Sequence, residues 1–217
     1  MLARSTNFCY SFYMHIYHVF NKSIAKFKIF PTRSYYKRFL ELINYYKVNP
    51  LVKFSDYKKL KSTNKIIDKN QQSIVEIIAF CLMPTHFHLV VYEKEEKMLS
   101  HFMRRLLDSY TRYFNKRTKR KGPLWVGRFK KVLVESDEQL LHLTRYVHLN
   151  PVSAGLVEKP EDWLYSSYRE YIEDQPLFKI CKFENFLSFS KEAYKSFVED
   201  RIDYQKTLEQ IKHLLLE

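Results

Sequence analysis

Residues Ser73–Tyr92 read SIVEIIAFCLMPTHFHLVVY, two apolar runs separated by a proline and a threonine. The first run, Ser73–Met83, is rich in β-branched and aromatic residues, which is typical of a buried strand. Pro84 and Thr85 favour a turn, and the second run, His86–Tyr92, again has the composition of a strand. This stretch therefore predicts a β-hairpin.

The segments on either side of this hairpin alternate between strand and helix patterns. Ser136, with Gln139 three residues later, forms a capping-box pattern that begins a helix, and Pro151 is expected to end that helix at Asn150. Two further helices are indicated by apolar residues at helical spacing. In chain order we expect a strand at Met14–Phe20, a helix at Ser34–Lys47, the hairpin, a helix at Leu99–Lys116, a strand at Leu124–Val134 and the helix from Ser136.

This order of elements is that of the ferredoxin-like, split βαβ fold. The sequence therefore predicts an α+β protein in which an antiparallel sheet carries helices on one face, with a C-terminal helical appendage. The appendage is indicated by apolar residues at helical spacing between Glu192 and Leu216. We divide the chain into an N-terminal extension (1–13), a main domain (14–172) and a C-terminal helical segment (173–217).

The composition argues for some functional classes and against others. A formal net charge of +13 favours a polyanionic partner, and with only three glycines the sequence contains no glycine-rich nucleotide loop. The three cysteines form no C-x-x-C pair, which fits a reducing cytoplasm. No apolar run approaches the length of a membrane span, and residues 1–20 lack the order of a signal peptide. We therefore expect a cytoplasmic protein without a membrane partner.

The positive charge is concentrated in the middle of the chain, where only Asp108 and Glu135 are acidic between Leu99 and Glu135. Basic residues can hold phosphates and aromatic residues can stack on unpaired bases. The part from Gly122 to Lys130 is equally compatible with an edge strand that has a charged outer face. The candidate DNA-binding residues of this stretch are Arg104, Arg105, Arg112, Lys116, Lys119, Arg120, Lys121, Trp125, Arg128, Lys130 and Lys131.

Two pairs of residues could carry chemistry. Side chains alternate along a strand, so His86 and His88 point to one face and can share a metal ion, while Phe87 points into the core. Tyr146 and Asn150 are four residues apart, so they share one face of a helix and offer a phenol and an amide oxygen. Taken alone, each pair also has an ordinary explanation, as incidental histidines of a strand or as a packed tyrosine.

In combination these residues stand in the order and spacing of a known family. The chain resembles the HUH single-tyrosine transposases, most closely the REP-associated tyrosine transposases, from Met14 to Tyr171. Lys22-Ser23 stands where that family often has Arg-Gly. The strings that carry the resemblance are YHVFNKS (Tyr17–Ser23), CLMPTHFHLVV (Cys81–Val91), YTRYFNKR (Tyr110–Arg117), GPLWVGRFKKVLVE (Gly122–Glu135), RYVHLNPVSAGLV (Arg145–Val157) and DWLYSSY (Asp162–Tyr168).

The resemblance implies a role for each site residue. His86 and His88 would be metal ligands, Tyr146 the nucleophile, and Asn150 would complete the metal site. The reaction would be cleavage and rejoining of single-stranded DNA through a 5′-phosphotyrosine, with Mg²⁺ or Mn²⁺ as the cofactor. The partner would be single-stranded DNA with palindromic hairpins, in the bacterial cytoplasm or nucleoid. The family contains monomers and homodimers, and both remain open here.

Three points stay open on the sequence alone. A phenol is a weak nucleophile that needs assistance, for which His142 and His148 are candidates. One alternative function is a non-catalytic nucleic-acid-binding regulator on the same fold, which would form no covalent DNA adduct. Another is a metalloprotein in which His86 and His88 hold a structural ion and DNA plays no part.

Overall fold

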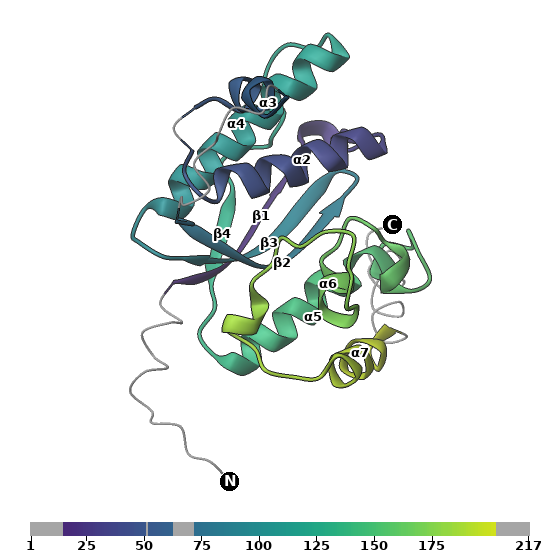
Figure 1. The fold of residues 1–217 in the computed structure, drawn as a ribbon. Coiled ribbons are helices and arrows are strands. Elements are labelled where there is room, and N and C mark those ends of the chain that lie inside the picture. Colours follow the sequence, from purple (N-terminus) through teal and green to yellow (C-terminus); the bar gives the residue numbers. More distant parts are fainter. Residues whose placement is uncertain (1–14, 51, 63–71, 203–217) are drawn as a thin grey trace.

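The computed structural model describes residues 15–50, 52–62 and 72–202, built around a four-stranded antiparallel sheet in the order β2-β3-β1-β4 (Figure 1). β2 and β3 form the predicted hairpin, in which Met83 pairs with His86 across the Pro84-Thr85 turn. β1 lies between β3 and β4 and is antiparallel to both. The strands are β1 (Ile16–Lys22), β2 (Val75–Met83), β3 (His86–Glu93) and β4 (Lys130–Leu133).

The fourth strand is shorter than the predicted strand at Leu124–Val134. Only Lys130–Leu133 pairs with β1, whereas Trp125 makes a separate bridge to Ser23. Residues 126–129 lie outside the ladder, and Gly127 among them lines a cavity. A glycine within a strand pattern often marks such an interruption, which the alternation of apolar residues does not reveal.

Two helices cover one face of the sheet, as the sequence predicts. α2 (Arg33–Tyr46) and α4 (Met98–Thr118) pack against each other on this face, and α3 (Phe54–Ser62) lies on their outer side (Figure 1). Phe87 of β3 points into this layer, where its ring centroid lies 5.2 Å from that of Phe39. Burial of such large aromatic side chains is a main source of stability, so this layer anchors β3.

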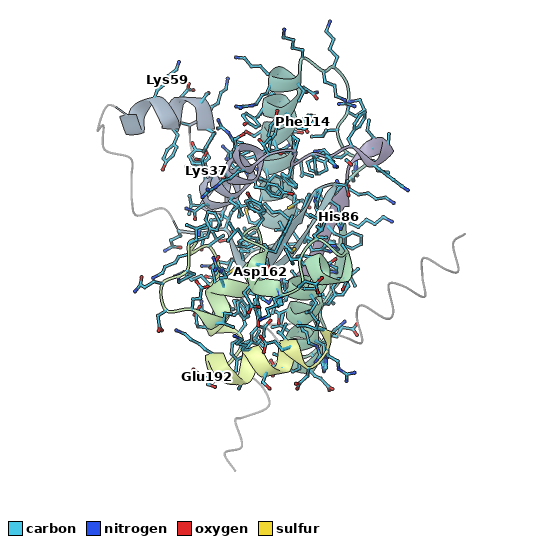
Figure 2. The ribbon with its side chains drawn as sticks, turned by 90° about the vertical axis from the view of Figure 1, so that its right-hand side faces the viewer. Lys37, Lys59, His86, Phe114, Asp162 and Glu192 are labelled. Carbon is cyan, nitrogen blue, oxygen red and sulfur yellow. The ribbon has the colours of Figure 1, made fainter. Side chains whose placement is uncertain are left out.

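The second half of the chain covers the opposite face of the sheet. α5 (Asp137–Ser153) packs on β2, and α6 (Tyr168–Ile172) and α7 (Lys191–Glu199) pack on each other, with α7 also against α5. Figure 2 shows Asp162 and Glu192 on this side and Lys37 and Phe114 on the other. Three short 3-10 helices complete the described part: η1 (Ile24–Lys26), η2 (Pro160–Asp162) and η3 (Phe183–Asn185).

α7 is the part of the expected C-terminal helix that the structure describes. The expected N-terminal extension (1–13) and the end of that helix (203–217) lie outside the described residues. Within the described ranges, none of the helices combines the length and the apolar character needed to cross a lipid bilayer.

Residues 165–182 cover the outer edge of β2. An uncovered strand edge offers free backbone groups to another chain, so this segment protects one edge of the sheet and leaves β4 as the other. Three backbone hydrogen bonds of 2.8–2.9 Å join the segment to β2, from Leu82 to Tyr165, from Ser167 to Phe80 and from Lys182 to Ile77.

α5, which carries Tyr146, begins where the sequence predicts. Ser136 is its N-cap, and Ser136 Oγ accepts a hydrogen bond from Gln139 N at 3.1 Å. The Gln139 side chain in turn accepts a hydrogen bond from Glu135 N at 2.6 Å. The capping pattern therefore fixes the start of the helix and the direction in which its first turn leaves β4.

The predicted end of α5 at Asn150 is wrong, because the helix continues through Pro151 to Ser153. Proline removes one backbone donor from the helix. The last turn is nevertheless supported by the hydrogen bond from Ala154 N to Asn150 O at 3.0 Å, and Pro151 and Val152 are buried. Packing of these two side chains offsets the missing hydrogen bond, so Asn150 lies inside the helix and not at its cap.

His148 fastens α5 to the segments that follow it. Its Nδ1 lies 2.7 Å from Tyr194 Oη, and its Nε2 lies 2.7 Å from Ser167 Oγ. Tyr194 Oη donates its hydrogen bond to Thr144 Oγ1 at 3.0 Å. It therefore accepts a hydrogen bond from the N–H group at His148 Nδ1. Complete burial lowers the pKa of His148 to about 3. The ring is therefore neutral, and both of its nitrogens are satisfied.

We expect His148→Ala to lower the free energy of unfolding by roughly 2–4 kcal/mol at about pH 7.5, because it removes two buried hydrogen bonds and opens a cavity. The loss should shrink at about pH 5. Below pH 6.5 the unfolded chain protonates His148, whereas the folded chain keeps it neutral down to about pH 3, so the unsubstituted protein itself loses stability there. Urea denaturation at both pH values measures the difference, and an equal loss at both would contradict a buried neutral ring.

Candidate active site

The hairpin places two imidazoles at one end of β3. His86 is half-buried and His88 is only 7% exposed, and both line one cavity. Their ring centroids are 5.2 Å apart and their planes are nearly perpendicular. Phe87 between them is buried in the opposite layer, so the alternation of β3 aims both imidazoles at the same space. Figure 2 shows His86 at the level of the sheet, between the two helical layers.

α5 presents Tyr146 and Asn150 to the same cavity. The Tyr146 side chain is 44% exposed, and its ring stands edge-on to His88 with the centroids 5.6 Å apart. Asn150 Nδ2 donates to the Tyr146 carbonyl at 2.8 Å, which orients the amide and leaves its oxygen for another partner. Val147 and Leu149 are buried on the packing side of α5 and thereby fix which residues face the cavity.

The cavity has a volume of about 690 Å³ and is lined by residues of β1, β3, α5 and the segment that leads into β4. It brings together the four residues that the sequence predicts as catalytic or metal-binding. Among the residues that the structure describes, its lining contains no Asp or Glu, whereas four cationic residues contribute to it: Lys22, Lys26, Arg128 and Lys130. A cavity of this charge suits a polyanion.

His18 of β1 is a site residue that the sequence analysis missed. Its Nε2 lies 2.9 Å from His88 Nδ1, and its ring centroid lies 6.0 Å from that of Tyr146. Phe20 is the cross-strand partner of His88, so His18 lies diagonally opposite His88 on the same face of the sheet. In the sequence, His18 is visible only as the histidine of the YHVF string. Its place beside His88 can be inferred only once the pairing of β1 with β3 is known.

Burial keeps these imidazoles neutral. It lowers the pKa of His18 to about 4 and that of His88 to about 3, and for His88 the neighbouring His18 and His86 add to the effect. Burial and, secondarily, the charge of Lys22 also lower the pKa of His86. At physiological pH the rings therefore have free lone pairs, which is the form of imidazole that binds metal ions.

The donor atoms of the cavity fit a divalent cation. Because Thr85 Oγ1 lies 3.1 Å from His86 Nδ1 and His18 contacts His88 Nδ1, the Nε2 atoms of both metal-ligand candidates remain available. Two imidazoles that share one ion through bonds of about 2.1 Å have centroids roughly 5 Å apart, which agrees with the observed 5.2 Å. Asn150 Oδ1 adds an oxygen ligand, and imidazole and carbonyl oxygen are suitable ligands for Mn²⁺ or Mg²⁺ in an open site.

This set of ligands differs from a fully protein-enclosed metal site. In the described part of the chain, no group of three or more His, Cys, Asp or Glu side chains is arranged to hold a metal ion. The candidate ligands are two imidazoles and an amide, fewer than the four protein ligands of a structural zinc site.

Neither histidine considered as an assistant of Tyr146 lines the cavity. His148 is the core residue described above and lies in the layer between α5 and α7. His142 Nδ1 accepts a hydrogen bond from Arg145 at 2.7 Å, and its ring packs against Phe197. Packing thus accounts for both rings, and we drop both as candidates for this role.

The predicted DNA-binding residues separate into distinct places. Arg128 and Lys130 line the cavity, and Lys131 lies on β4 with its Nζ 4.2 Å from the centre of the Tyr17 ring. The remaining exposed cations are on α4 or the loop that follows it, and α4 covers the face of the sheet opposite to Tyr146. These exposed residues are Arg104, Arg112, Lys116, Lys119 and Lys121.

Three predicted DNA-binding side chains are held by contacts within the protein. Arg105 donates to Asn49 Oδ1 and Pro50 O, both at 2.8 Å, and Arg120 donates to Asn115 Oδ1 at 3.2 Å. Trp125 donates from Nε1 to Thr111 Oγ1 at 2.9 Å, and its ring packs edge-on against Phe87 in the core. The ring of Trp125 is thus part of the packing that anchors β3, and its role in DNA binding stays a prediction.

Comparison with known proteins identifies a transposase family. The model of the family described as "Transposase IS200 like" matches residues 11–150. The Haemophilus influenzae protein named "Putative REP-associated tyrosine transposase" is 32% identical over 108 residues, which cover 45% of this chain and 61% of that protein, so the match spans less than two thirds of that relative.

A solved structure shares the fold. It is a REP-associated tyrosine transposase bound to a REP hairpin, with a TM-score of 0.55, 16% identity and coverage of 88% of this chain and 96% of that chain. This likeness confirms the predicted fold class, an antiparallel sheet with helices and a C-terminal helical region.

We expect the rings of His18 and His88 to show no protonation step between about pH 8 and pH 5 in the metal-free protein, because burial lowers the pKa of the first to about 4 and of the second to about 3. Ring ¹⁵N chemical shifts of histidine-labelled protein measure this directly, with His18→Gln and His88→Gln used for assignment. A titration near pH 6.5 in either ring would mean that the site is open to water.

Proposed function

We propose, from the premise that the chain belongs to the IS200-like transposase family, that it cleaves and rejoins single-stranded DNA beside hairpins with Tyr146 as the nucleophile. The observation that carries the proposal is the exposed phenol of Tyr146, edge-on to His88 in a cavity lined by four cations. The REP hairpin bound to the transposase of similar fold supports hairpin DNA as the partner.

The proposed reaction exchanges one ester bond for another. Tyr146 Oη attacks the phosphorus of a backbone phosphodiester and loses its proton, a 5′-phosphotyrosine bond forms, and the bond to the 3′ oxygen breaks. The released 3′ oxygen takes up a proton and becomes a hydroxyl. Attack by a 3′-hydroxyl on the phosphotyrosine reverses the step and rejoins DNA without ATP, because the bond energy is conserved in the covalent intermediate.

The chain's own residues would hold the metal ion and the substrate. His86 Nε2, His88 Nε2 and Asn150 Oδ1 would bind Mg²⁺ or Mn²⁺, which supplies Lewis-acid stabilisation of the phosphate oxygens. In the proposed state His88 Nδ1 would donate to His18 Nε2 across their 2.9 Å contact, which leaves the lone pair of His88 Nε2 for the ion. Arg128 and Lys130 would bind backbone phosphates in the cavity.

We assign the catalytic unit to residues 14–172 and treat 173–217 as a helical segment attached to it. In the described part of this segment, Ile180 N and Cys181 N both donate to Glu170 Oε2 at 2.8 Å, which ties the segment to α6. The proposal also includes the metal ion, the single-stranded substrate and a cytoplasmic location. It is compatible with a monomer and with a homodimer.

Tyr146→Phe should abolish covalent attachment to DNA and leave DNA binding unchanged, because only one exposed hydroxyl oxygen is removed. Labelled single-stranded DNA carrying a hairpin is incubated with the protein and Mn²⁺, and a denaturant-resistant protein–DNA band is measured. Tyr113→Phe is the matched control, since Tyr113 is on α4 and outside the cavity lining. An adduct that persists in Tyr146→Phe would disprove the assignment. The absence of any adduct from the unsubstituted protein, with DNA binding retained, would favour the non-catalytic regulator.

His86→Ala should weaken Mn²⁺ binding by about tenfold or more, since loss of groups that hold or orient a metal ion costs affinity on this scale, and it should abolish cleavage. Isothermal titration calorimetry measures the affinity separately from activity. His142→Ala removes an imidazole that does not line the cavity and serves as the control. Equal Mn²⁺ affinities in the two variants would exclude His86 as a ligand.

A further inference from the structure

The connection that leaves β1 carries an unusual backbone conformation beside the candidate active site. Ala25 and Lys26 are consecutive non-glycine residues with φ of 48° and 53°. In this left-handed region the Cβ atom crowds the backbone, so single residues with side chains are uncommon there and two in succession are rarer still. Such conformations persist only where the surrounding structure enforces them, and they concentrate at functional sites.

Hydrogen bonds from three directions enforce this turn. Ser23 N donates to Thr85 O of the β2–β3 turn at 2.9 Å, and Ile24 N donates to Leu124 O at 3.0 Å. Ser23 Oγ donates to Phe27 O at 2.7 Å and closes the turn on itself. The conformation of residues 23–27 is therefore fixed by the segments next to His86 and before β4, and does not depend on a local sequence preference.

The result of this geometry is that two lysines face the cavity. Lys22 pairs with His86 in the β1–β3 register, and Lys26 stands on the left-handed turn four residues later. Both are exposed, and both line the cavity with Tyr146. In the described ranges neither forms an ion pair with a carboxylate, so their charges are available to a ligand.

Arg128, in the segment that leads into β4, and Lys130, the first residue of β4, line the same cavity as the two lysines. Asn21 Nδ2 donates to Gly127 O at 3.1 Å, and Val126 N donates to Lys22 O at 3.0 Å, so the two segments that carry the cations are joined to each other. Four cations along one cavity match a chain of phosphates rather than a single small anion.

We propose that Lys22 and Lys26 form a clamp for a backbone phosphate of the DNA strand in the cavity, with the strained turn at Ala25-Lys26 holding Lys26 in place. The inference rests on the proposed function and adds to it the residues that bind the strand on the β1 side. The left-handed turn sets the direction of the Cα–Cβ bond of Lys26, whose side chain lines the cavity.

The test measures binding without cleavage. In the Tyr146→Phe background, the affinity for a fluorescent single-stranded oligonucleotide is measured by anisotropy at several salt concentrations. Each phosphate neutralised on single-stranded DNA contributes about 0.7 to the slope of log K against log salt, so Lys22→Met with Lys26→Met should lower the slope by about 0.7 and weaken binding roughly tenfold at moderate salt.

The control removes the same charge elsewhere. Lys179→Met with Lys182→Met changes two lysines outside the cavity lining and should leave the slope unchanged. Lys22→Arg with Lys26→Arg keeps both charges and should retain the slope. Equal slopes for the two methionine pairs would overturn the clamp, and so would an arginine pair as impaired as the methionine pair at these positions, because that result would indicate damage to the turn.

The outcome for the clamp is separable from that for the proposed function. Covalent attachment is measured with Tyr146 intact, whereas phosphate binding is measured with Tyr146→Phe. A protein that forms the adduct but shows no slope change in the lysine variants retains its proposed function and refutes the clamp. A protein that forms no adduct but shows the slope change keeps the clamp as a nucleic-acid contact without transposase chemistry.

Discussion

The candidate active site depends on the alternation of side chains along β3. Phe87 is packed against Phe39 and Trp125 on one face of the sheet, and this forces His86 and His88 to the other face. A shift of one residue in register would place both imidazoles among aromatic rings and turn Phe87 into the cavity, at the cost of unpaired polar groups in the core. The aromatic layer under α2 and α4 is thus what positions the predicted metal ligands.

Packing of α5 likewise determines the direction in which the Tyr146 side chain points. On its inner side His148 is saturated with hydrogen bonds to Tyr194 and Ser167, and this network fixes the rotation of the helix about its axis. Tyr146, two residues earlier, is consequently directed outward, where its ring meets His88 edge-on. The orientation of the candidate nucleophile, whose side chain is exposed, therefore depends on a buried polar network on the opposite side of the same helix.

Local sequence patterns were sufficient for the elements and for the residues that share one element. Hydrophobic periodicity predicted the hairpin and α4, and Ser136 with Gln139 predicted the start of α5. The pattern failed where tertiary packing decides, because α5 continues through Pro151. His18 and Lys26 were missed for a related reason, since their functional placement arises from pairing between strands and from hydrogen bonds to distant segments, which no local period encodes.

The charges of the cavity would couple binding of the proposed metal ion to binding of the proposed DNA substrate. The candidate ligands are neutral imidazoles and a neutral amide, and the described lining offers four cations and no carboxylate. A divalent cation bound there would find its charge uncompensated by the protein, whereas a DNA phosphate would neutralise both the ion and the neighbouring lysines. Each ligand therefore improves the site for the other, and this coupling is reciprocal by thermodynamic necessity. The proposed metal site, built from neutral donors, would thus favour the DNA-bound state, and the four cations of its described lining would favour a polyanionic substrate.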